Sequence, residues 1–257
     1  YYSLIENQMK ISIITATYNR ESTIIRAISS VRSQTYGNVQ LVIIDGASTD
    51  ETVELIKPFM SASDIVCSEQ DHGIYDALNK GINLSNGEVI AFLHSDDLYI
   101  DEEAVSNVMK LFEDDEVDIV YGDVSFFNGN NPEKVTRIYH SDDLSQRNLA
   151  WGKMPAHPAI FVRRRVYNRV GNFKIDYQIA ADYEFLCRLV KDAEFKVKRL
   201  PRVLVRMQSG GASTRGIKSF FLLNREVYRA LRENGIYTNY FMLFSKYFSK
   251  VRQFLIS

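Results

Sequence analysis

The stretch Glu88-Val89-Ile90-Ala91-Phe92-Leu93-His94-Ser95-Asp96-Asp97 runs from a continuous apolar segment directly into two adjacent carboxylates. A short apolar run of this kind is typical of a strand buried on both faces of a sheet. Two neighbouring carboxylates at the end of a strand repel each other, so a divalent metal ion is an economical partner for them. A second interpretation stays open, in which Asp96 and Asp97 form a turn and cap a helix that begins near Glu102.

Outward from this strand, apolar runs alternate with helical patterns through the first half of the chain. Strands are predicted at residues 11–16, 39–44, 65–67, 89–93 and 117–124, and helices at residues 24–31, 50–59, 77–84 and 104–112. Strand–helix alternation predicts an α/β fold in which helices cover both faces of a mostly parallel sheet. Such sheets bind ligands beyond the carboxyl ends of their strands.

After residue 126 the alternation stops. A turn cluster at residues 128–132 is followed by a predicted hairpin or edge strand at 135–139, a strand at 159–162, a helix at 182–190 and strand material at 196–207. From residue 217 the pattern is helical, with a division near Gly235. We expect an N-terminal extension at residues 1–9, one domain at 10–215 with halves 10–126 and 127–215, and a helical extension at 216–257.

Composition narrows the function classes. Only Cys67 and Cys187 are present, which argues against a disulfide framework and a cysteine-based zinc site and fits a reducing, cytoplasmic compartment. No apolar run approaches the ~20 residues that span a bilayer, and there is no signal-peptide pattern. The absence of G-x-G-x-x-G and of G-x-x-x-x-G-K-[ST] disfavours a dinucleotide site and a P-loop.

The charges of the two halves of the chain differ strongly. Residues 1–152 carry 10 basic and 25 acidic side chains, whereas residues 153–257 carry 21 and 7. An acidic half suits a metal site, and a basic half suits phosphates or an anionic membrane surface. Equally, the two halves could attract each other within one domain. Nucleic-acid binding is not expected, because no recognition motif accompanies the basic residues.

Polar motifs follow three of the predicted strands. They are Thr15-Ala16-Thr17-Tyr18-Asn19-Arg20, Asp45-Gly46-Ala47-Ser48-Thr49-Asp50 and the pair Asp96-Asp97. Together with Gly73-Ile74-Tyr75-Asp76-Ala77-Leu78-Asn79-Lys80-Gly81 and Ala181-Asp182-Tyr183-Glu184, they resemble the motifs of the family 2 glycosyltransferases, which are inverting enzymes with the GT-A fold. The resemblance covers residues 10–213. It implies transfer of a sugar from a nucleotide-sugar, first of all a UDP-sugar, to a glycan or lipid-linked glycan in bacterial surface-polysaccharide assembly.

The resemblance also implies roles on the donor side. Thr15 and Tyr18 would line the nucleotide pocket, and Asp45 would accept a hydrogen bond from the base. Further donor-side candidates are Asp71, Asn79, Lys80, Ser95, Asp97 and Arg206, although a structural ion pair suits Arg206 equally well.

Metal binding is implied at the last position of the family's D-x-D motif, which is Asp96 here. It would hold Mg²⁺ or Mn²⁺ on the diphosphate. Two residues depart from the family pattern: His94 stands where the first Asp of D-x-D is common, and Gln208 stands where many relatives place a metal-binding His. Both are further ligand candidates. The alternative for His94 is a contact with the sugar or nucleotide, or simple packing, and the alternative to Gln208 is a metal shell completed by water.

Asp182 matches the acidic residue that serves as general base in the family. An acceptor hydroxyl is a poor nucleophile at neutral pH, and a positioned carboxylate that takes its proton contributes about 10²–10⁴ in rate. A role as helix N-cap is the structural alternative for Asp182. His157, Trp151 and Glu184 are the acceptor-side candidates, with a core or gating role as the alternative for Trp151.

The segment 217–257 carries 7 basic and 2 acidic residues among many aromatic ones. This pattern suits peripheral contact with the inner face of an anionic plasma membrane; the alternative is packing on the domain or on a second copy in a homo-oligomer.

Two rival functions remain. One is nucleotidyl transfer, which the lack of a Gly-rich loop after the first strand disfavours, and the other is a non-catalytic or degenerate nucleotide-sugar-binding or glycan-binding module.

Overall fold

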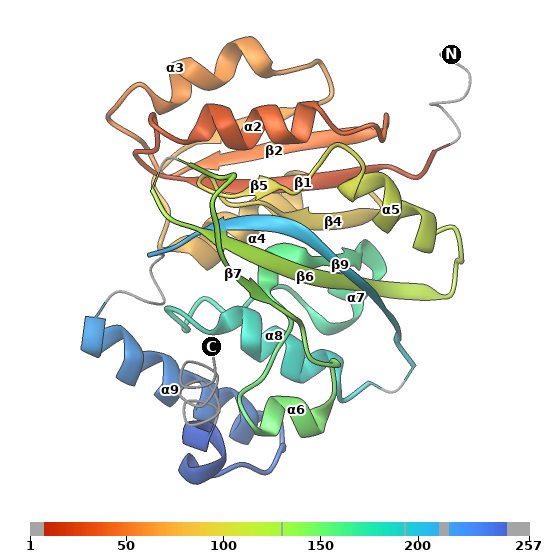
Figure 1. Cartoon of the computed structure of the whole chain (residues 1–257), viewed down its shortest axis with the longest axis vertical. Helices are drawn as coiled ribbons and strands as arrows, with labels where there is room; N and C mark the ends of the chain where they lie inside the picture. The colour runs from red at the N-terminus through yellow and green to blue at the C-terminus, as the bar shows by residue number, and fades with distance from the viewer. Residues whose placement is uncertain (1–7, 130, 193, 211–215, 246–257) are drawn as a thin grey trace.

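The computed structural model describes residues 8–129, 131–192, 194–210 and 216–245 (Figure 1). In chain order the elements are β1 (Ile11–Thr17), α2 (Ile24–Arg32), β2 (Val39–Asp45), α3 (Thr52–Ile56), η1 (Lys57–Phe59), β3 (Ile65–Ser68), α4 (Ile74–Leu84), β4 (Val89–Phe92), β5 (Leu98–Tyr99), α5 (Ala104–Leu111), β6 (Val117–Phe127), β7 (Val135–Tyr139), α6 (Gln146–Ala150), η2 (His157–Ala159), β8 (Ile160–Arg163), α7 (Arg164–Val170), α8 (Ala181–Leu189), β9 (Lys196–Gln208) and α9 (Gly216–Glu233).

In the described part of the chain, nine strands form one mixed sheet in the order β3-β2-β1-β4-β8-β6-β9-β5, with β7 paired to β6. The strands β1 to β4 run parallel, β8 lies antiparallel between β4 and β6, and β9 runs parallel to β6. The carboxyl ends of β1, β2, β4 and β9 therefore meet at one edge. The predicted α/β fold with a mostly parallel sheet is confirmed.

The central strands are mostly apolar, and helices cover both faces of the sheet (Figure 1). Ile13 packs with residues of α2 and α5 on one face, whereas its neighbour Ile14 packs with residues of α4, α8 and α9 on the other. Adjacent side chains of a strand point to opposite faces. The absence of polar alternation in the sequence follows from this double burial.

Most predicted elements are present, and the differences have local causes. The helix predicted at 50–59 divides into α3 and a 3₁₀ turn that contains Pro58, because proline has no backbone N–H with which to continue the α-helical hydrogen bonds. β5, α6 and α7 were not predicted. Each is too short, at two to seven residues, to establish a hydrophobic period.

Charged side chains of the two halves form ion pairs with each other. Eight ion pairs among the described residues join a basic side chain after residue 152 to an acidic one before it: Lys153–Asp142, Arg163–Asp115, Arg165–Asp118, Lys196–Glu116, Lys198–Asp114, Arg199–Asp123, Arg202–Asp101 and Arg206–Glu133. These pairs involve eight of the 21 basic residues after position 152, so part of the charge asymmetry is balanced within the molecule.

The C-terminal helix α9 joins the main core. Its Val227, Ala230 and Leu231 lie in the same apolar cluster as Leu186 of α8. Residues 246–257, which hold the rest of the segment predicted to contact a membrane, lie outside the described residues, as do residues 1–7. Within the described helices, none combines the length and apolar character needed to cross a bilayer.

Candidate active site

The loops after β1 and β2 are fastened to each other at the shared edge of the sheet. Gly46 N donates to Thr17 O at 2.9 Å, Asn19 N donates to Ser48 Oγ at 2.8 Å, and Thr49 N donates to Asn19 Oδ1 at 2.9 Å. Asn19 (φ 49°) and Ala47 (φ 59°) adopt left-handed backbone conformations. Such strain in a non-glycine residue persists where the surroundings over-determine it, often at functional sites.

Asp45 organises this loop. It is fully buried; its Oδ2 accepts from Ser48 N at 2.9 Å and from Ser68 Oγ at 2.6 Å, and its Oδ1 accepts from the Ser48 hydroxyl. Thr15 is also buried. The predicted contact of Asp45 with a nucleotide base stays a prediction.

Tyr18 and Asp71 meet beside Gly46. The Tyr18 side chain is 56% exposed. A Cβ atom on Gly46 would stand 2.6 Å from Asp71 Oδ2 and 3.5 Å from the Tyr18 ring. Asp71 Oδ1 in turn accepts from Gly73 N at 2.9 Å, just before α4 begins. Glycine at position 46 therefore permits these two predicted donor-side residues to approach each other.

Asn79 and Lys80 of α4 are engaged elsewhere. Asn79 binds the backbone of Phe173 through both amide atoms, at 2.8 and 3.0 Å. Lys80 forms ion pairs with Glu69 at 2.9 Å and with Asp76 at 3.4 Å. Their described contacts fasten α4 to neighbouring loops, and no contact here supports a diphosphate role for either side chain.

The carboxylates Asp96 and Asp97 differ in how deeply they are buried. Asp97 is 2% exposed; its Oδ1 accepts from Gln208 N at 3.0 Å, and its Oδ2 is buried without a partner among the described residues. Burial, together with the neighbouring Asp96 charge, raises the pKa of Asp97 well above its ordinary value. Asp96 is only partly buried. The capping interpretation is wrong, because α5 has Glu103 at its N-cap and no side-chain cap.

The donors around Asp96 limit how a metal could bind. Burial lowers the pKa of His94, which favours its neutral form, and the amide oxygen of Gln208 already accepts from Arg26 Nη2 at 3.2 Å. Within the described residues no three His, Cys, Asp or Glu side chains form a metal-binding group. This donor set fits Mg²⁺ or Mn²⁺ only where a diphosphate and water supply most of the ligands; it does not fit a cage made by protein alone.

Asp182 lies in the first turn of α8. Its Oδ1 accepts from Tyr183 N at 2.8 Å and from Tyr75 Oη at 3.1 Å. Burial raises the pKa of Asp182 to about 6. The helix begins at Ala181 with Ala180 as N-cap, so the N-cap interpretation of Asp182 is wrong.

A narrow cavity connects Asp182 to β4. Its lining includes Asp182, His157 and Phe92, the last residue of that strand. His157 stacks on Phe92 with ring centroids 4.9 Å apart and lies 6.0 Å from His94. Burial lowers the pKa of His157 to about 3, so its imidazole is neutral. Phe92 and His157 therefore line the cavity together with the predicted base.

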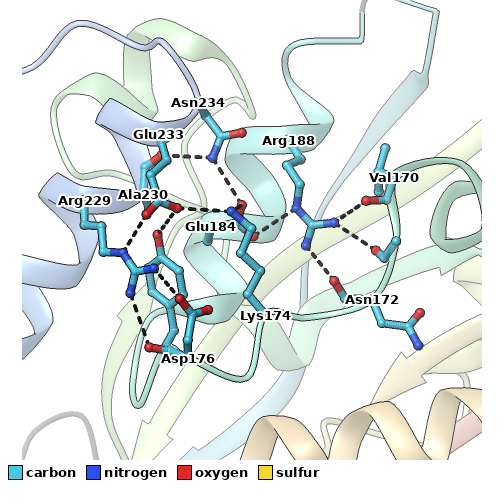
Figure 2. Close-up of polar contacts among 12 residues, drawn as sticks. Val170, Asn172, Lys174, Asp176, Glu184, Arg188, Arg229, Ala230, Glu233 and Asn234 are labelled. Carbon is cyan, nitrogen blue, oxygen red and sulfur yellow. Dashed lines mark hydrogen bonds and ion pairs between the residues drawn. The ribbon is translucent and has the colours of Figure 1, made fainter.

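Several predicted site residues are not brought to this region. Glu184 is fully buried in a polar cluster with Lys174, Arg188 and Asn234 (Figure 2), so the structure gives no support for its acceptor-side role. Arg206 forms an ion pair with Glu133, as in its structural alternative. Trp151, 37% exposed, follows α6. Ser95, by contrast, lies at the site, buried in the turn directly before Asp96.

Sequence reasoning missed three residues of the site. Tyr75 lies within the motif at residues 73–81, but no role was expected for it, although its hydroxyl contacts Asp182. Arg26 binds Gln208 across 182 positions, and no local pattern predicts such a contact. Gly46 could have been singled out, because a glycine directly after a strand often marks a close approach.

Comparison with known proteins identifies the protein family. Residues 12–171 match the family described as glycosyl transferase family 2. The chain belongs to this family and is a glycosyltransferase. A PGL/p-HBAD biosynthesis glycosyltransferase of Mycobacterium bovis (strain BCG / Pasteur 1173P2) is 31% identical over 217 residues, which cover 82% of each chain. The Escherichia coli UDP-Glc:alpha-D-GlcNAc-diphosphoundecaprenol beta-1,3-glucosyltransferase WfaP is 35% identical over 113 residues, 43% of this chain and 44% of that protein.

Solved structures support the GT-A fold. S. aureus TarS 1–349 in complex with UDP-GlcNAc aligns with a TM-score of 0.68 at 17% identity, over 87% of this chain and 66% of that one, just under two thirds of its length. The mannosyltransferase PcManGT from Pyrobaculum calidifontis, in complex with GDP-Man and Mn²⁺, aligns with a TM-score of 0.62 at 15% identity, over 98% and 82%.

Proposed function

We propose that this glycosyltransferase moves a sugar from a UDP-sugar to a hydroxyl of a glycan or lipid-linked glycan in one inverting displacement. The observation that carries the proposal is the position of Asp182, a carboxyl with a pKa near 6, in a cavity that it shares with the end of β4. Support for the donor comes from the TarS structure with UDP-GlcNAc, and support for a lipid-linked acceptor from the diphosphoundecaprenol in the name of the E. coli relative.

Asp182 acts as the general base. Its two described donors both bind Oδ1, so Oδ2 is the oxygen that would accept the proton of the acceptor hydroxyl. With a pKa of about 6 the carboxylate is ionised at neutral pH, yet it is more basic than an ordinary Asp. The neutral ring of His157 lines the same narrow cavity as Asp182.

Asp96 is the residue that would bind the cation. It is the more exposed of the two carboxylates, whereas Asp97 is buried against β9. A bound Mg²⁺ or Mn²⁺ would neutralise the charge that develops on the departing diphosphate. Tyr18 and Asp71 form the nucleotide side of the same edge.

Replacing Asp96 by Ala tests this assignment. We expect the affinity for UDP, measured by calorimetry with Mn²⁺, to fall at least about tenfold, since the cation loses its protein ligand. The affinity in EDTA should be unchanged. Glu103→Ala removes one carboxylate from the N-cap of α5 and should leave both affinities alone. Equal UDP affinity of the unmodified protein with and without Mn²⁺ would show that Asp96 has no metal role.

Peripheral membrane contact at the cytoplasmic face is proposed for the C-terminal segment. Phe221, Tyr237, Tyr240 and Phe241 are exposed, and the segment is rich in Lys and Arg. Interfacial aromatic rings and basic residues favour an anionic bilayer surface. Such contact would bring the site close to a lipid-linked acceptor.

A binding module without catalysis is the second candidate. It is favoured by His94 in place of an acidic residue and by the sparse metal donors among the described residues. Analysis of the products formed from UDP-sugars separates it from the enzyme.

A further inference from the structure

Glu226 of α9 binds three successive backbone N–H groups of a distant segment. Its Oε1 accepts from Gln178 N at 2.8 Å, and its Oε2 accepts from Ile179 N and Ala180 N, both at 2.9 Å. The side chain is buried. Hydrogen bonds from N–H groups to an ionised carboxylate are shorter and about twice as strong as neutral ones. This single side chain therefore fixes the chain immediately before α8.

That segment leads directly into the general base. Ala180 is the N-cap of α8 and has no side-chain cap, and Asp182 follows two residues later. The carboxylate of Glu226 binds the N–H groups of residues 178–180, so it holds the backbone that leads into the helix rather than capping the first helical turn itself. Its negative charge also suits the positive end of the α8 dipole.

A second clamp holds the same segment from α4. Tyr75 Oη lies 2.6 Å from Ile179 O and 3.1 Å from Asp182 Oδ1. Ile179 is thus bound through its N–H by α9 and through its carbonyl by α4. Movement of either helix would displace the Asp182 carboxylate, and small displacements of reacting groups are costly in rate.

Glu226 also acts on Asp182 electrostatically. Burial is the larger cause of the raised pKa of Asp182, and the charge of Glu226 adds to it. A nearby carboxylate disfavours a second ionised carboxylate. The same contact that sets the position of the base therefore makes it a stronger proton acceptor.

We propose that Glu226 is a positioning residue for catalysis, through which the C-terminal helix holds and tunes the general base. The proposal rests on the function proposed for Asp182. It also gives α9 a role in the reaction, independent of any membrane contact.

The test compares Glu226→Gln with Glu233→Gln. Glu233 lies two turns further along α9 and contacts Lys174, Tyr177 and Arg229, but has no described contact with residues 178–180. The protein is labelled with [¹³Cγ]Asp, the Asp182 signal is assigned from Asp182→Asn, and its pKa is measured by NMR. Release of UDP from UDP-glucose with Mn²⁺ is followed in parallel.

In Glu226→Gln we expect the pKa of Asp182 to fall below the value in the unmodified protein, because a negative neighbour is lost. The kcat for UDP release should fall roughly 10- to 100-fold with KM little changed. Glu233→Gln should lower the melting temperature and leave the pKa of Asp182 and the kcat unchanged. An unchanged pKa of Asp182 in Glu226→Gln, or equal effects of the two variants, would overturn the proposal.

If Glu226→Gln does not fold, Glu226→Asp decides. It keeps the charge but shortens the side chain by one methylene, so kcat should fall without a change in KM. A kcat equal to that of the unmodified protein overturns the proposal. Failure of the proposed function looks different: Asp182→Asn would then retain full turnover, whatever the Glu226 variants do.

Discussion

Asp182→Asn is expected to lower turnover by about 10²–10⁴ while the affinity for the donor stays the same. Asparagine still has a side-chain oxygen, Oδ1, that can accept from Tyr183 N and Tyr75 Oη, so the start of α8 should be preserved. The variant loses Oδ2, the carboxylate oxygen that would take the proton of the acceptor hydroxyl. Turnover is measured as UDP release, and donor affinity by calorimetry with UDP.

The pH dependence gives a second readout for the same residue. Because burial raises the pKa of Asp182 to about 6, the base is protonated at lower pH, and kcat of the unmodified protein should fall as the pH drops through about 6. A raised pKa in the folded state also means that ionisation opposes folding, so this stability contribution is complete below the ordinary Asp value and is lost as the pH rises through 6. Asp182→Asn should therefore be at least as stable as the unmodified protein at pH 8.

Asp192→Asn is the matched control for this experiment. Asp192 follows α8 and pairs with Arg169, remote from the cavity. Its replacement should leave kcat and its pH dependence unchanged. Turnover of Asp182→Asn near the level of the unmodified protein would remove Asp182 as the base.

Glu184→Ala is expected to lower the free energy of unfolding by about 3–5 kcal/mol, the usual cost of removing one partner from a buried ion pair. Glu184 is fully buried; its Oε1 lies 3.0 Å from Lys174 Nζ and 3.2 Å from Asn234 Nδ2, and its Oε2 lies 2.9 Å from Arg188 Nε (Figure 2). Without it, two cations remain in a partly buried cluster that joins α8, α9 and the loop before α8.

Urea unfolding measures this effect. Glu194→Ala is the control, because Glu194 is exposed and pairs with Arg169 at the surface, where an ion pair contributes only about 0–1 kcal/mol. A Glu184→Ala protein with unchanged unfolding and a specific loss of transfer to the acceptor would restore the acceptor-side role that the sequence suggested.

The sheet was predictable because its central strands are buried on both faces and therefore appear in the sequence as largely apolar runs, such as residues 89–93. The edge that carries the site was predictable for a related reason. Parallel strands bring their carboxyl ends together, so Asp45 and Asp96 had to lie at the same side. Short elements such as β5 and α7 gave no period and were missed.

Individual side-chain roles were less predictable, because their partners come from distant segments. Asp182 and Glu184 are two residues apart on one helix, yet one faces the cavity and the other a buried ion-pair cluster. Asn79 looked like a donor-side residue, but it binds the backbone of Phe173, 94 positions away. No local pattern contains such pairings, since they depend on how the helices pack.

The most direct test of the account is a product analysis of the unmodified protein incubated with UDP-sugars and Mn²⁺. A glycosyltransferase cleaves the bond between sugar and diphosphate, so slow hydrolysis without an acceptor should release UDP and free sugar in equal amounts, with no pyrophosphate. Pyrophosphate would indicate nucleotidyl transfer. No product from any UDP-sugar, in a protein that binds UDP, would contradict the central claim and favour a binding module.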